Sequence, residues 1–64
     1  MKVEIGQMWA PQQGTSPCRD ILQVFQTQAG KTSVTYRTED GSAYVATLES
    51  WQQWVTATRA ERVA

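Results

Sequence analysis

The stretch K-T-S-V-T-Y-R-T-E-D-G-S-A-Y-V-A-T-L, residues 31–48, decides the fold of this 64-residue chain. Over residues 31–38 apolar and polar side chains alternate, which is the period-two pattern of a half-buried β-strand. Asp40 and Gly41 follow, and Asp-Gly between two such runs is the strongest short-range signal of a tight hairpin turn. The stretch therefore predicts a β-hairpin whose second strand covers residues 43–48.

Two more strands are predicted on the N-terminal side of this hairpin. The run I-L-Q-V-F-Q-T-Q at residues 21–28 is rich in residues that favour strands, and A-G at residues 29–30 suits a second tight turn. Residues 2–9 alternate as a first strand, and Gly6 inside it predicts a bulge or a sharp bend. Residues 10–20 hold both prolines and show no periodicity, so they are predicted to form a loop.

A helix is predicted over residues 51–60. Ser50 as N-cap, with Gln53 three residues later, matches the capping-box pattern at a helix start. The apolar residues that follow recur at helical spacing and form one stripe, which must pack on the sheet. The stripe consists of Trp51, Trp54 and Val55.

These elements predict a single, mainly β domain over residues 1–64. A chain of this length buries only about 60% of the surface of its unfolded form, so its core is small. The sheet must curl to enclose that core, which predicts a small SH3-like antiparallel β-barrel of about four to five strands with a short C-terminal helix. The alternative is an open antiparallel sheet with the helix packed across one face. Trp9, Trp51 and Trp54 are expected in the core, and the alternative is an aromatic groove for a Pro-rich peptide, a methylated Lys or an unpaired base.

The composition excludes several kinds of catalytic and metal chemistry. The chain has no His and one Cys, so it lacks the base of Ser-His-Asp and Cys-His catalysis, the ligands of a zinc site and a partner for a disulfide. No spacing pairs two of the six carboxylates across a cleft for acid–base work. We therefore expect no enzymatic activity, no cofactor and no metal.

Charge and hydropathy predict the localisation of the protein and the partners that it disfavours. Six basic residues balance six acidic ones, and a net charge of zero disfavours strong non-specific binding to nucleic acid or to anionic membranes. No apolar run has the length of a signal peptide or a membrane span, so a cytoplasmic protein is expected. Cys18 is expected to be reduced. Arg19 is its neighbour in the sequence, and a nearby positive charge lowers the pKa of a thiol and makes it reactive. The alternative is that Cys18 is an incidental loop residue without a role.

Three motifs carry a resemblance to other proteins. They are V-E-I-G-Q-M-W at residues 3–9, V-T-Y-R-T-E-D-G at residues 34–41 and L-E-S-W-Q-Q-W at residues 48–54. Together they resemble small uncharacterised proteins of phages and prophages, which have a G-Q-x-W opening, a V-x-Y-R…D-G hairpin and a closing helix that bears Trp. The resemblance implies an SH3-like barrel and an origin in a mobile genetic element, and it implies no reaction. The loop of residues 11–19 departs from the pattern.

The candidate partner-binding surface is built from polar strand residues, one aromatic residue and one loop residue. On residues 31–38 the polar side chains share one strand face of mild positive character, which suits a carboxylate or a phosphate. The alternative is an ordinary solvated face. The candidate residues are Arg19, Lys31, Ser33, Thr35, Arg37 and Tyr44.

Three hypotheses for the function remain. The first is a non-catalytic protein-binding module from a phage or other mobile element that acts on a host protein, for example as an anti-defence or anti-CRISPR inhibitor. The second is a weakly nucleic-acid-binding accessory protein or transcriptional regulator. The third is a structural oligomer, and exposed edge strands also suit a homodimer.

Overall fold

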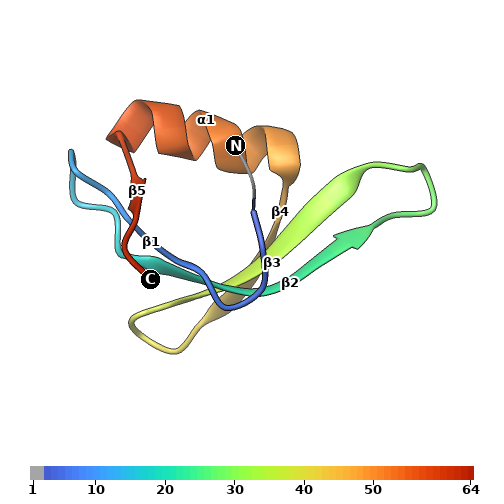
Figure 1. Ribbon diagram of the computed structural model, residues 1–64, viewed down its shortest axis with the longest axis horizontal. Helices are drawn as coiled ribbons and strands as arrows, with labels where there is room; N and C mark the ends of the chain where they lie inside the picture. Colours follow the sequence, from blue (N-terminus) through green and yellow to red (C-terminus); the bar gives the residue numbers. More distant parts are fainter. Residues whose placement is uncertain (1–2) are drawn as a thin grey trace.

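The computed structural model describes residues 3–64, and Figure 1 shows its ribbon. Within that range five strands and one helix follow one another along the chain. They are β1 (Met8–Ala10), β2 (Arg19–Gln26), β3 (Thr32–Thr38), β4 (Ala43–Thr47), α1 (Leu48–Thr58) and β5 (Glu61–Arg62). The strands form one antiparallel sheet in the order β4-β3-β2-β1-β5. The protein is therefore mainly β, as predicted.

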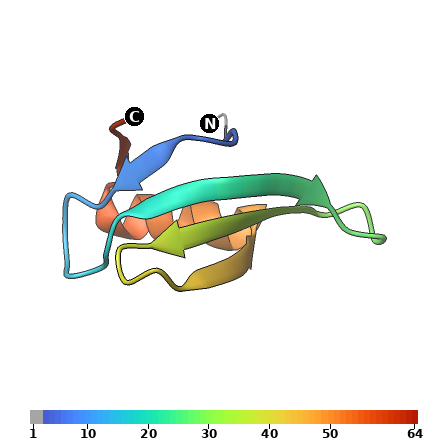
Figure 2. The same cartoon turned by 90° about the horizontal axis from the view of Figure 1, so that it is seen from below.

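The helix lies across one face of this sheet. Figure 2, seen from below, shows the strands in front and α1 behind them. Among residues 3–64 no strand pairing joins β4 to β5, so these two strands are the edges of an open sheet. Among these residues the strands therefore form an open sheet with α1 across one face, and a closed barrel is not shown.

The first strand is shorter than predicted because the chain turns before it. The Gln7 amide donates to the Glu4 carbonyl (N···O 3.3 Å), and Gly6 between them has a φ of 91°. A positive φ at the third residue of a turn favours glycine, so the predicted sharp bend at Gly6 is confirmed. The strand begins at Met8 rather than at residue 2, and Lys2 itself lies outside the described residues.

The second strand begins earlier than predicted, and the turn after it is longer. β2 starts at Arg19 instead of residue 21 and ends at Gln26 instead of residue 28. The Thr27 amide then donates to the Lys31 carbonyl, and the Gly30 amide donates to the Thr27 carbonyl, both at 2.9 Å. Lys31 therefore belongs to the turn and not to β3.

The Asp-Gly turn between β3 and β4 is confirmed. Gly41 has a φ of 87°, and its amide donates to the Thr38 carbonyl (3.0 Å). The Asp40 carboxylate accepts hydrogen bonds from the Thr38 hydroxyl and from the Ser42 amide. These bonds stabilise the ionised carboxylate and hold the pKa of Asp40 below its ordinary value.

The helix begins three residues earlier than predicted because β4 runs directly into it. Thr47, the last residue of β4, is the N-cap, and its side chain accepts a hydrogen bond from the Ser50 amide (3.1 Å). The prediction of Ser50 as the N-cap is therefore wrong: Ser50 already lies in the first turn. The helix ends at Thr58, and Arg59 in the left-handed conformation (φ 51°) reverses the chain.

A short final strand completes the sheet and was not predicted as a separate element. It lies beside β1, where Trp9 pairs with Arg62. The Val63 amide donates to the Met8 carbonyl (2.8 Å), and the Met8 amide donates to the Ala64 carbonyl (3.0 Å). The end of the described chain is thus hydrogen-bonded to its first strand.

The hydrophobic core lies between α1 and the sheet. Its buried members are Trp9, Ile21, Val34, Trp51 and Ala60. Trp51 and Val34 have no exposed surface at all, and Trp54 packs against this cluster while remaining partly exposed. The predicted core positions of Trp9 and Trp51 are confirmed, and Trp54 lies at the margin.

Candidate functional site

The strand register divides the candidate residues between the two faces of the sheet. Ile21, Tyr36 and Tyr44 align across β2, β3 and β4, and Ile21 is buried in the core, so this row faces α1. Arg19 precedes Ile21 by two residues and therefore faces α1 as well. The structure thus brings Arg19 and Tyr44 to the same side, while Arg37 and its alternating neighbours face the other way.

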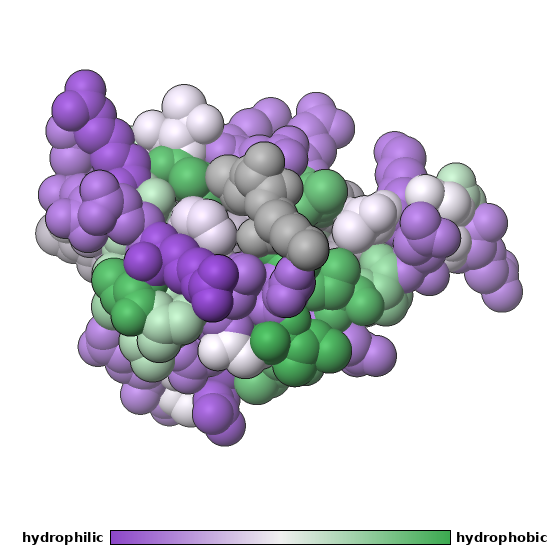
Figure 3. Space-filling view, in the orientation of Figure 1, coloured by the Kyte–Doolittle hydropathy of each residue, from purple (hydrophilic) through white to green (hydrophobic). Residues whose placement is uncertain are grey.

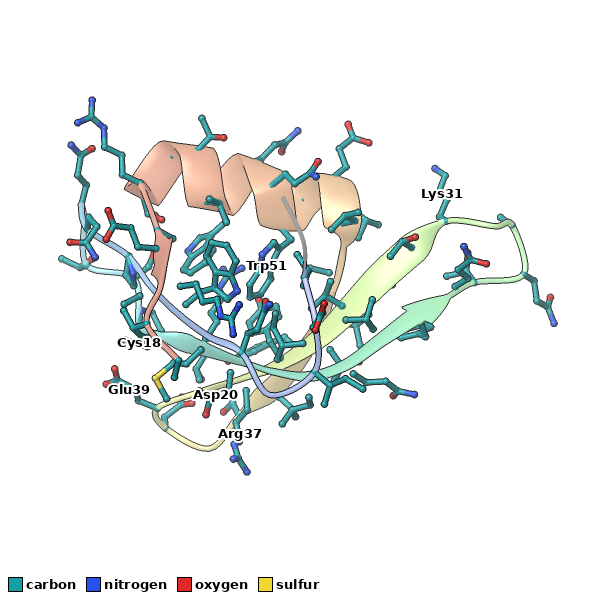
Figure 4. The ribbon with its side chains drawn as sticks, in the orientation of Figure 1. Cys18, Asp20, Lys31, Arg37, Glu39 and Trp51 are labelled. Atoms are coloured by element: carbon teal, nitrogen blue, oxygen red, sulfur yellow. The ribbon has the colours of Figure 1, made fainter. Side chains whose placement is uncertain are left out.

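The face turned away from α1, which we call the outer face, carries polar and apolar residues together. Ser33, Thr35 and Arg37 of β3 lie on it. Arg37 aligns with Asp20 on β2, and Figure 4 shows both side chains pointing away from the helix. Thr35 aligns with Val45, whose side chain is 64% exposed. The outer face therefore combines one aligned pair of opposite charges with an exposed apolar residue.

Two of the candidate strand residues do not belong to an exposed polar stripe. Ser33 is only 4% exposed because it aligns with the larger Phe25 on the neighbouring strand. Lys31 lies in the turn at the far end of the β2–β3 hairpin, well away from Arg37 in Figure 4. Leu22, at an irregularity in the β2–β3 register, is instead 39% exposed. The prediction of a continuous Lys-Ser-Thr-Arg surface is therefore wrong in its geometry.

A second candidate surface lies on the helix side, where an arginine stacks on aromatic rings. The Cζ atom of Arg19 is 4.3 Å from the ring centroid of Tyr36, 4.0 Å from that of Trp54 and 5.5 Å from that of Trp51. Tyr44 lies beside Tyr36, with ring centroids 5.6 Å apart and 31° between the planes. We call these five residues the arginine–aromatic cluster.

This cluster contains hydrogen-bond donors that have no acceptor in the described part of the protein. Arg19 Nε, Trp51 Nε1 and Trp54 Nε1 are all buried without a partner there. The remaining tryptophan differs, because Trp9 Nε1 donates to the Gln7 side-chain oxygen at 3.0 Å. A buried donor without an acceptor costs about 1–3 kcal/mol, so three in one cluster require an explanation.

The guanidinium of Arg19 is partly desolvated and pairs with no carboxylate of residues 3–64. Burial disfavours its charged form and lowers the pKa of Arg19, and the interaction with Tyr36 acts in the opposite direction. An arginine nevertheless remains charged at neutral pH. The ring faces of Tyr36 and Trp54 stabilise that charge, by about 2 kcal/mol where a cation is desolvated.

The surroundings of Cys18 raise the pKa of its thiol above the ordinary value. A hydrogen bond to Glu39 raises the pKa of the Cys18 thiol, and burial and the negative charges of Glu39 and Asp20 act in the same direction. Figure 4 shows the Cys18 sulfur beside Glu39. The idea that Arg19 lowers this pKa is therefore wrong, because the Arg19 side chain faces α1 and the charges that act on the thiol are those of Glu39 and Asp20.

Two shallow depressions lie outside the arginine–aromatic cluster. One, of about 370 Å³, is on the exposed face of α1, and the other, of about 260 Å³, lies between the β2–β3 turn and the start of α1. Their lining residues are Glu49, Gln52, Gln53, Thr56 and Ala57 for the first, and Lys31, Thr32, Thr47, Leu48 and Glu49 for the second. Among residues 3–64 no three Cys, Asp or Glu side chains converge on a common point that would hold a metal.

Sequence reasoning missed Tyr36 and Trp54 as partners of Arg19. It placed Arg19 in a loop because residues 10–20 hold both prolines and show no periodicity. The available signal was the two-residue spacing from Arg19 to Ile21, which puts the arginine on the face of a strand that also carries a core residue.

Searches against protein-family models, curated proteins and solved structures gave no match to this chain. Within the described residues the single helix is too short and too polar to cross a lipid bilayer. The candidate surfaces must therefore be interpreted from their own chemistry.

Proposed function

We propose that this protein is a non-catalytic protein-binding module and that the outer face of its sheet is the main contact surface. The observation that carries the proposal is the one-sided cover of the sheet: α1 packs on one face, while Val45 and Leu22 remain exposed on the strands. Figure 3, which views the molecule from the side with α1 above the sheet, shows hydrophobic residues at the surface below the helix. Exposed apolar surface framed by polar residues is typical of a protein interface.

The charge of the outer face favours a protein over nucleic acid as the partner. Its cation Arg37 lies opposite the carboxylate of Asp20, so the face has no basic stripe to follow a phosphate backbone. The described chain exposes 4287 Å² in total, and a stable interface takes about 800 Å² from each partner. Such an interface would take about a fifth of the whole surface.

We further propose that the partner is a host protein and that the module belongs to a phage or similar element, in the cytoplasm. The three sequence motifs that resemble phage and prophage proteins support this origin, and an anti-defence or anti-CRISPR inhibitor is one form of it. An SH3-like architecture is part of the same proposal. It is supported by the strand order β4-β3-β2-β1-β5, in which the last strand returns to lie beside the first.

Affinity capture from host lysate, with and without nuclease, tests the proposal. We expect one protein to be retained in both samples, and to be lost when Val45→Glu places a charge on the outer face. Ala57→Glu is the matched control, since Ala57 is exposed on the opposite side of the molecule, on α1. Capture that nuclease abolishes would instead support the nucleic-acid-binding alternative, and capture unaffected by Val45→Glu would remove the outer face from consideration.

One observation also favours self-association. β4 is an edge strand with exposed Val45 at its centre, and such an edge is a template for pairing with a second copy. Sedimentation analysis over a range of concentrations distinguishes a protein that self-associates from one that stays monomeric until it binds a different protein. A dimer that dissociates in the Val45→Glu variant would support a structural oligomer.

A further inference from the structure

We propose that the arginine–aromatic cluster is a binding site for a carboxylate of an acidic polypeptide, with Arg19 as the group that pairs with it. The site lies on the side of the sheet that faces α1, so it does not depend on the outer face or on its partner. The observation behind it is chemical: three N–H donors meet in one cluster, and no acceptor among residues 3–64 bonds to them.

The geometry fixes the guanidinium in advance of binding. Tyr36 and Trp54 hold its plane by stacking at 4.3 and 4.0 Å from Cζ. Arg19 Nε is buried without a partner, while Arg19 as a whole residue keeps part of its surface exposed. A planar fork held in this way matches the two oxygens of a carboxylate and loses little side-chain entropy when it pairs.

The neighbouring carboxylates of the chain are already engaged. Thr38 aligns with Arg19 across the β2–β3 pair, and Glu39 and Asp40 follow it directly. Asp40 accepts bonds from Thr38 and from the turn, and Figure 4 shows Glu39 beside the sulfur of Cys18. The guanidinium therefore remains available for an external carboxylate.

The same neighbours favour a carboxylate over a nucleic-acid phosphate. A phosphate backbone is bound by several cations, and the cluster provides one guanidinium. Glu39 and Asp40 directly follow Thr38, the strand partner of Arg19, and add negative charge nearby. A single carboxylate needs one arginine and suffers less repulsion from these acids. Tyr44, 48% exposed beside Tyr36, adds an aromatic surface for an apolar residue next to the bound acid.

The three tryptophan indoles make this site measurable in the intact protein. We would titrate ¹⁵N-labelled protein with a capped peptide of sequence E-E-L-E-E and follow the indole N–H resonances at low salt. The resonances of Trp54 and Trp51 should move together and saturate, while that of Trp9, already bonded to Gln7, should stay in place. The capped peptide Q-Q-L-Q-Q should bind at least about tenfold more weakly, because hydrogen bonds to charged groups are the stronger ones.

Two arginine variants separate the cluster from general electrostatics. Arg19→Gln should weaken E-E-L-E-E binding by about tenfold or more, while Arg37→Gln, which removes an equal charge from the outer face, should leave it unchanged. Equal binding of the two peptides, or equal effects of the two variants, would overturn the proposal. So would an oligothymidylate that shifts the Trp54 resonance as strongly as the acidic peptide does. If Arg19→Gln does not fold, the comparison of peptides on the unaltered protein decides the question.

Discussion

Replacing Trp51 by alanine is the sharpest test of how this small protein is held together. Trp51 has no exposed surface, and its ring lies 6.4 Å from Trp9, 5.5 Å from Tyr36 and 5.2 Å from Trp54, centroid to centroid. Truncation of a fully buried Trp costs about 3–5 kcal/mol. The free energy of unfolding is about 0.05–0.15 kcal/mol per residue in native proteins, which gives roughly 3–10 kcal/mol for a chain of 64 residues. Trp51→Ala should therefore remove between a third of the stability and all of it.

Thermal unfolding followed by far-ultraviolet circular dichroism measures this effect. In a domain of this size each kcal/mol lowers Tm by about 4–8 °C, so Trp51→Ala should lower it by roughly 12 °C or more, or leave no folded baseline. The matched control is Gln52→Ala, one residue along on the exposed face of α1, which should change stability by less than about 0.5 kcal/mol. An unchanged Tm for Trp51→Ala would refute the packing of α1 on the sheet.

Three further outcomes are expected. Thr47→Ala should cost about 1 kcal/mol by removing the N-cap, and Ser50→Ala should cost less because only its amide takes part, as a comparison of the two Tm values would show. Alkylation of Cys18 at pH 8 should be slower in the folded protein than in denaturant, because a raised pKa lowers the thiolate fraction, and Glu39→Gln should speed it. Folding lowers the pKa of Asp40, so the ionised carboxylate stabilises the folded protein at pH values above its ordinary pKa of 3.8. This stabilisation is lost as the pH falls through the pKa of Asp40 in the folded protein. Asp40→Asn should therefore make Tm depend less on pH in the acid range.

The hairpin of residues 31–48 could be predicted because its signals are local. Side-chain alternation specifies β3 without reference to the rest of the chain, and Asp40-Gly41 meets the backbone requirement of the turn by itself. The helix was also predicted, but not its start. Thr47 is both the last residue of β4 and the N-cap of α1. Its place in the strand pattern therefore hides the helix start, because no loop residue separates the two elements.

The remaining features depend on contacts between distant segments. β5 is only two residues long and exists because β1 lies beside it, so no local pattern marks it. The two faces of the sheet differ only because α1 covers one of them. The face that α1 covers determines that Arg19 lies beside the helix and that Arg37 lies on the outer face. The arginine–aromatic cluster joins residues from β2, β3, β4 and α1, and its existence follows from the fold rather than from a motif.

The pairing of β1 with β5 also implies an order of folding. It joins Trp9 to Arg62, residues separated by 53 positions (62 minus 9), whereas β2, β3 and β4 are neighbours in sequence and pair through short turns. Closing a long loop costs more chain entropy than closing a short one, so the three-strand meander should form first and the terminal pairing last. The same pairing should open first. Amide hydrogens of Met8 and Val63 should exchange with solvent ahead of those around Val34, even in the fully folded population.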